Sequence, residues 1–326
     1  MPSSITHAYF SVDLYNELPK KCQERIDLDY LKMFTQGSDP FMFYNFFVGK
    51  KNKTISHIQY IVHTKKTNMF FKNNISYIID NNLNNNKEIL SYLYGYISHY
   101  YLDLYTHPFL YYKTGYFDKN DKSTYKYNGL HQKYEYLIDL YYINKREKII
   151  YYKFKPHKFL FNKTNISKEL SKLIDTTFEV TYKLKNTSSY YKKSLKDMYL
   201  FYKYVNYDPY SYKLFIYKMV DKLTMPSMIK IQELSFHNSL DNINSILNLD
   251  NLEWCLPWDN KKISNISFNG LYKLALNEAI KTITQLDDMI EKKKLDNNLI
   301  NSLFTNLSLV TGLNCNKKVV MKYFEN

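Results

Sequence analysis

The sequence predicts an all-α fold, in which a multi-helix metal-binding domain is followed by a second helical region. Only 7 glycines and 8 prolines occur in 326 residues, which disfavours the many tight turns of a β-sandwich or β-barrel. Long stretches carry apolar residues at helical intervals, separated by short polar or proline-containing segments. The chain is long enough for one large domain or two. We expect a metal-binding domain over residues 1–160 and a helical region of unknown role over 161–326.

The expected helices follow from this periodicity and from the residues that interrupt it. They cover residues 19–34, 63–83, 88–105, the segment that carries His131 and Glu135, and then 166–184, 187–206, 210–224, 227–240 and 267–294. Pro40 and Pro108 mark breaks, because proline lacks a backbone donor and disfavours helical backbone in the residue before it. A non-helical segment over 254–258 interrupts the second half.

Composition limits the partners and the compartment. The net charge of +14 would suit nucleic acid or an anionic membrane surface, but a solvated, lysine-rich surface also accounts for it, since the lysines form no single block. Three widely spaced cysteines indicate a reducing compartment, and no signal peptide is visible, so we expect a cytoplasmic protein. The long segment 89–112 lacks Lys and Arg, but its central histidines and aspartate argue against a transmembrane span.

Histidine and carboxylate residues recur at a spacing of four. One helical turn takes about 3.6 residues, so His99, Asp103 and His107 share one face of a helix, and His131 and Glu135 share a face on another. Four residues advance about 6 Å, so His99 and Asp103 can meet at one ion, whereas His107 lies about 12 Å from His99 and needs a second. The spacing therefore predicts at least two metal ions bridged by Asp103, with the second helix completing the site of His107.

Each pair taken alone has a simpler interpretation, a salt bridge along a helix face. Three such pairs together with His7 and His63 favour a metal site. Metal ions about 3.5–4 Å apart can hold a phosphoryl group and activate water between them. The predicted reaction is therefore the hydrolysis of a phosphoric ester.

The order of these residues resembles the zinc-dependent phospholipase C family of bacteria, in the superfamily that includes the fungal single-strand nucleases. The resemblance covers residues 1 to about 140, and its specificity lies in the order of motifs that are individually weak. The motifs are Thr6-His7-Ala8-Tyr9-Phe10, Gln36-Gly37-Ser38-Asp39-Pro40 with Phe43-Tyr44-Asn45, His63 followed by Phe70-Phe71, Tyr94-Gly95-Tyr96-Ile97-Ser98-His99 through Asp103 to His107-Pro108, and Leu130-His131 to Glu135. More weakly, residues 247–258 and 268–272 resemble a segment that follows the metal domain in some relatives.

The resemblance implies two or three zinc ions and a set of ligands for each. The implied ligands are Asp39, His63, His99 and Asp103 for the first ion, His107, His131 and Glu135 for the second, and His7 with Asp103 as a bridge for the third. Asp39 is also implied as a candidate general base for the attacking water.

The chain departs from the family pattern at its amino end. Secreted relatives expose a tryptophan there, whose main chain completes the third site, and no tryptophan lies near His7. We expect removal of Met1, after which the main chain of Pro2 could supply the missing ligands.

Three functions stay open at this point. The first is a phospholipase C-like hydrolase of phosphoric esters, with phospholipid as the favoured substrate and contact with a membrane surface. The second is a nuclease or another phosphodiesterase on the same scaffold, and the third is a helical protein that binds metal without catalysis. Aromatic residues such as Tyr44, Phe70 and Tyr100 could contact a choline-like cation or stack on a nucleobase.

The remaining histidines rank lower as ligands. His57 could replace His63, but its register to the Phe70-Phe71 pair fits worse. His157 and His237 lie outside the pattern.

Overall fold

Helices form nearly all of the regular structure in the computed structural model, which describes residues 4–48, 52–147, 154–208, 210–223, 231–235 and 242–325. The elements in chain order are α1 (Ser4–Glu17), α2 (Lys20–Glu24), α3 (Leu28–Phe34), η1 (Asp39–Phe43), α4 (Lys53–Thr64), α5 (Thr67–Asp80), α6 (Lys87–Thr114), η2 (Lys122–Tyr127), α7 (Leu130–Glu147), α8 (Pro156–Leu160), α9 (Lys168–Tyr182), α10 (Thr187–Leu200), η4 (Phe201–Asn206), α11 (Tyr212–Leu223), η5 (Ile231–Leu234), α12 (Ile243–Leu247), β1 (Trp254–Leu256), β2 (Asp259–Ser264), α13 (Phe268–Glu291) and α14 (Asn297–Leu303). The all-α prediction is confirmed, with one small antiparallel hairpin, β1–β2, among the described residues.

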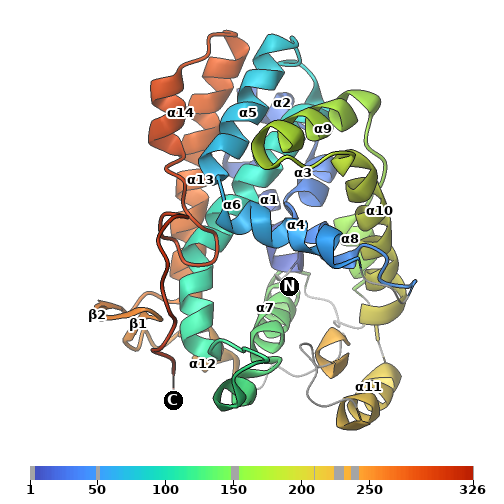
Figure 1. The fold of residues 1–326 in the computed structure, drawn as a ribbon, viewed down its shortest axis with the longest axis vertical. Coiled ribbons are helices and arrows are strands. Elements are labelled where there is room, and N and C mark those ends of the chain that lie inside the picture. Colours follow the sequence, from blue (N-terminus) through green and yellow to red (C-terminus); the bar gives the residue numbers. More distant parts are fainter. Residues whose placement is uncertain are drawn as a thin grey trace.

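The long helix α6 is the centre of the fold (Figure 1). It is buried along most of its length, with α3 and α13 packed against it and α1 and α7 also in contact with it. Gly95 permits the close approach of α3, because a Cβ there would lie 2.7 Å from the main chain of Phe34. Helix α13 comes from beyond residue 160, so the two predicted regions pack on each other. The boundary between them stays a prediction.

Two of the predicted helices are each divided in two. Residues 19–34 form α2 and α3, because the Asp27 side chain accepts hydrogen bonds from the amides of Asp29 and Tyr30 and starts a new helix. The predicted helix 63–83 is also wrong in its start, since His63 lies in the last turn of α4. Lys66 then takes a left-handed conformation, with φ of 51°, before α5 begins.

Pro108 does not end α6, contrary to the prediction. The helix continues to Thr114 and ends at Gly115, where φ is 70°. Proline inside a helix costs about 3 kcal/mol. Burial of the following turn offsets that cost, because Phe109 is fully buried and its ring packs against Trp254, with ring centroids 5.2 Å apart.

The second half follows the predictions more closely. Helices α9, α11 and α13 form within the expected ranges, and α10 continues as the π-helical segment η4 to Asn206. The predicted helix 227–240 lies largely outside the described residues, which show there only the 3₁₀ turn η5. The expected break at 254–258 is the β1–β2 hairpin. Within the described parts of the chain, no helix combines the length and the apolar character needed to cross a membrane.

Candidate metal centre

The eight predicted ligands come together where α1, η1, α4, α6 and α7 meet. Three lie on α6, two on α7 and one on each of the other elements. Seven of them are buried, and the side chain of His131 is 17% exposed. Their donor atoms form three groups, each within 4.8 Å, and the groups are His7, His99 and Asp103; Asp39, His63 and His99; and His107, His131 and Glu135.

The Asp103 carboxylate lies between two pairs of imidazoles. Its Oδ2 is 3.2 Å from the Nε2 atoms of both His63 and His99, and its Oδ1 is 3.0 Å from Nε2 of His7 and 3.5 Å from Nε2 of His107. Burial opposes ionisation, but the surrounding imidazoles, chiefly that of His107, outweigh it and hold the pKa of Asp103 well below its usual range. Asp103 thus turns one oxygen to each pair, as its predicted role as a bridging ligand requires.

Two of these imidazoles present the same ring nitrogen to each other. The Nδ1 of His99 is 3.0 Å from the carbonyl oxygen of Thr35, and that of His63 is 2.8 Å from the carbonyl oxygen of Gln59. Because a carbonyl only accepts, each Nδ1 carries a proton and donates it. In their neutral forms both rings then turn Nε2 lone pairs toward each other across 3.1 Å. A cation that accepts both lone pairs resolves this contact.

The surroundings of His99 also favour positive charge. Burial opposes its protonation, but the carboxylates of Asp103 and Asp39 outweigh burial and raise the pKa of His99 to about 9. The His99 imidazole therefore favours its protonated form near neutral pH when no metal is bound. The site fits a divalent cation in the chemistry of its donors, since neutral imidazole and carboxylate are common zinc ligands.

Asp39 lies at the start of η1 with its carboxylate in the same pocket. Both of its oxygens are buried and accept no hydrogen bond from any described residue, and Nε2 of His63 lies 3.4 Å from Oδ1. A buried polar group left unsatisfied costs about 1–3 kcal/mol, and a charged one costs more. Asp39 thus lacks a hydrogen-bond donor among the described residues, as a carboxylate that serves as a metal ligand would.

The third group lies nearest to the surface. Nε2 of His131 is 3.0 Å from Oε1 of Glu135, and the ring centroids of His107 and His131 are 5.9 Å apart. Burial opposes ionisation of Glu135, but the neighbouring imidazole of His131 keeps its pKa below the usual value. Tyr111 stacks on His131, with centroids 4.7 Å apart. The exposure of His131 indicates that the cluster is open to solvent on this side.

The carboxy-terminal segment supports the cluster from outside. The carbonyl oxygen of Leu309 accepts a hydrogen bond from Nδ1 of His107 at 2.8 Å. The amide of Leu309 donates to the carbonyl oxygen of His63, also at 2.8 Å. One residue of this segment therefore contacts both α4 and α6 at the ligand-bearing positions and fixes the ring nitrogen that His107 presents to the cluster.

At the amino end, Asp139 positions the helix that carries His7. Its carboxylate accepts hydrogen bonds from the amides of Ile5 and Thr6 and from the Thr6 hydroxyl, and burial raises the pKa of Asp139 to about 7. The sequence analysis missed this residue, although its spacing of four from Glu135 on α7 could have indicated it. Pro2, the expected completing ligand beside His7, lies outside the described residues.

Gly37 permits the observed position of the His99 ring. Its φ is 54°, and a Cβ there would lie 2.6 Å from Cδ2 of His99. We expect Gly37→Ala to lower the free energy of unfolding by about 1–3 kcal/mol and to weaken zinc binding, as measured by thermal unfolding and zinc titration. Gly270→Ala is the control for crowding alone, because its Cβ would lie equally close, 2.6 Å, to Ile266 outside the cluster and its φ is not positive. Equal zinc affinity in both variants would contradict this role of Gly37.

The lower-ranked histidines do not join the cluster. His57 is exposed and stacks on Tyr60, while His157 is buried against Tyr199. His237 lies outside the described residues.

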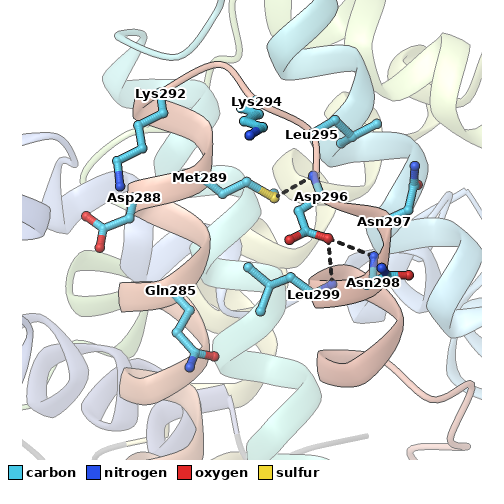
Figure 2. A pocket seen from close by; sticks show the side chains of 10 residues that line it. All are labelled: Gln285, Asp288, Met289, Lys292, Lys294, Leu295, Asp296, Asn297, Asn298 and Leu299. Atoms are coloured by element: carbon cyan, nitrogen blue, oxygen red, sulfur yellow. Dashed lines mark hydrogen bonds between the residues drawn. The ribbon is translucent and has the colours of Figure 1, made fainter.

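A cavity of about 490 Å³ lies outside the cluster, between the end of α13 and the start of α14 (Figure 2). The Asp296 carboxylate in it accepts hydrogen bonds from the amides of Asn298 and Leu299, which begin α14. Asp288 pairs with Lys21. One of these acidic groups caps α14 and the other pairs with α2, so the size of this cavity does not make it the reactive site.

Comparison with known proteins agrees with the geometry of the cluster. The family model described as zinc dependent phospholipase C matches residues 6–214, more than half of the 326 residues. No curated protein and no solved structure gave a significant match.

Proposed function

Because the chain belongs to the zinc-dependent phospholipase C family, we propose that it hydrolyses phosphoric esters, with a phospholipid as substrate and zinc ions held by the eight-residue cluster. The observation that carries this proposal is the contact of His63 and His99. Their Nε2 atoms lie 3.1 Å apart beside the Asp103 carboxylate, and the Nδ1 protons are directed away from the cluster. Family membership favours phospholipid as the substrate. The alternative, nucleic acid, was suggested by the net charge of +14.

The ligands follow the three groups of the cluster. Two ions would be held by Asp39, His63, His99 and Asp103, and by His107, His131 and Glu135; a third would lie between His7 and Asp103, with Pro2 as its expected further ligand. When bound, zinc supplies Lewis acidity, which lowers the pKa of water and neutralises charge on the phosphoryl oxygens.

The protein's own contribution is to orient the substrate and to move a proton. Asp39 has carboxylate oxygens without a hydrogen-bond donor among the described residues, so it can accept the proton of the attacking water as a general base. The substrate would enter beside His131, where the cluster is partly exposed. Around that opening, Tyr60 and Tyr116 are about half exposed and could receive the cationic end of a lipid head group by cation–π contact.

The role of Asp39 is tested by Asp39→Asn. We expect turnover of a chromogenic phosphocholine ester to fall about 10²–10⁴-fold. Zinc content, measured by elemental analysis, should be retained, because His63, His99 and Asp103 remain as ligands of the ion that Asp39 would share. The control Asp175→Asn changes an aspartate outside the cluster that accepts hydrogen bonds from Ser188, and should leave turnover unchanged. Unchanged turnover in Asp39→Asn would exclude Asp39 as the base.

The same assay separates the competing functions. Turnover of the phosphocholine ester without cleavage of single-stranded DNA would support the phospholipase assignment. The reverse result would support a nuclease, and zinc-loaded protein that is inactive on both would support a non-catalytic role.

A further inference from the structure

Helix α11 turns its apolar side chains away from the protein. It lies at one end of the molecule, at the lower edge of Figure 1, and packs against η5. Phe215 is 68% exposed and Leu223 is 84% exposed, and Tyr212, Ile216 and Met219 are also exposed on the same side of the helix. These positions follow the spacing of one helical face. A surface helix of a globular protein ordinarily has the opposite orientation.

Hydrogen bonds of its polar residues fix this orientation. Asp221 is buried, and its carboxylate accepts hydrogen bonds from two backbone amides of η5, at 2.7 and 2.9 Å. Lys213 reaches back to the preceding segment and donates to the carbonyl oxygens of Tyr204 and Tyr207, at 2.6 and 2.7 Å. Rotating the apolar face inward would break these contacts, so its exposure is built into the structure.

The charge on the outward side is positive. Asp221 is the sole acidic residue of α11 and faces inward, whereas Lys218 and Lys222 are exposed along one edge of the apolar face. A helix with an apolar face bordered by lysines is typical of helices that lie in the interface of an anionic membrane. A symmetric contact with a second copy through this face would offer these lysines no acidic partner on the outward side of α11.

We propose that α11 docks the protein on an anionic phospholipid surface, inserting Phe215 and Met219 and placing Lys218 and Lys222 against lipid phosphates. This inference rests on the proposed function for its biological purpose, because it brings the enzyme to a membrane-bound substrate. Its physical basis is independent of the metal centre. From residue 215 onward, this face also lies beyond the 6–214 match to the family.

The proposal is tested by sedimentation of the full chain with vesicles of phosphatidylcholine that contain phosphatidylserine. We expect binding to fall at least about 10-fold in the double variant Phe215→Ser with Met219→Ser, and about 10-fold in Lys218→Glu with Lys222→Glu. The matched control is Val180→Ser with Leu252→Ser, which removes two other exposed apolar side chains and should leave binding unchanged. Vesicles of phosphatidylcholine alone should bind the wild type more weakly.

Several results would overturn the proposal. One is that the α11 variants bind the vesicles as strongly as the wild type. Another is that the control variant loses as much vesicle binding as the α11 variants do. A dimer in analytical ultracentrifugation that Phe215→Ser dissociates would assign the face to a second copy instead. Hydrolysis of a soluble phosphocholine ester, unaffected by the α11 substitutions, separates the two proposals: vesicle binding without hydrolysis defeats only the proposed function, and hydrolysis without vesicle binding defeats only this inference.

Discussion

Asp103→Asn is expected to abolish zinc retention and to lower turnover by more than about 100-fold, beyond the 10–100-fold typical of losing an outer-shell partner. The reason is that each Asp103 oxygen faces two imidazoles, and an amide would turn an NH₂ group toward one pair. Elemental analysis and the phosphocholine ester assay measure the two effects. Removing one member of a buried charged cluster should also cost about 3–5 kcal/mol of folding free energy.

The control for this variant is Asp197→Asn. Asp197 is as deeply buried as Asp103, but it pairs with Lys193 outside the cluster. The Asp197→Asn variant should have a lower free energy of unfolding, while its folded form keeps its zinc. Full zinc content in Asp103→Asn would show that Asp103 is not a bridging ligand.

Removal of zinc is expected to destabilise the protein in a pH-dependent way. At free zinc 1,000 times above its Kd, binding contributes about 4 kcal/mol, which corresponds to a fall in Tm of about 6 °C on chelation for a chain of this length. Without metal, the pKa of His99 is about 9 against an ordinary value of 6.5. Its contribution to stability is therefore complete below pH 6.5 and is lost as the pH rises through 9.

Zinc binding has the opposite dependence, because it requires His99 to lose its proton. The difference in Tm between zinc-bound and zinc-free protein should therefore widen from pH 6.5 to 9, as measured by scanning calorimetry. His57→Gln, a change at an exposed histidine outside the cluster, should leave this difference as it is. Parallel curves for the two forms would contradict the assignment of His99 as a ligand.

The sequence could predict five members of the cluster because their spacing is local, whereas the roles of His7, Asp39 and His63 were implied by the resemblance. His99, Asp103 and His107 lie on one helix, so helix geometry alone aligns them. The structure brings all eight predicted residues together, and their role as zinc ligands stays a prediction. The contact of Leu309 with His107 joins residues about 200 positions apart, and no local pattern encodes such a contact.

The boundaries of the helices and the orientation of α11 were harder to predict from the sequence. The division of the predicted helix 63–83 depends on the left-handed backbone of Lys66, a residue type with no special preference for that conformation. Pro108 stays inside α6 because long-range packing against Trp254 outweighs a local rule. In α11, an apolar stripe defines a face but not whether that face turns toward the core or toward solvent.

The backbone contacts of Leu309 have a consequence for what counts as the functional unit. A fragment cut at residue 214, where the family match ends, would contain all eight predicted ligands. It would lack the segment around Leu309, whose backbone forms hydrogen bonds with His107 and His63. The part of the chain needed to order the cluster therefore extends well beyond the residues that match the family, into the carboxy-terminal segment around Leu309.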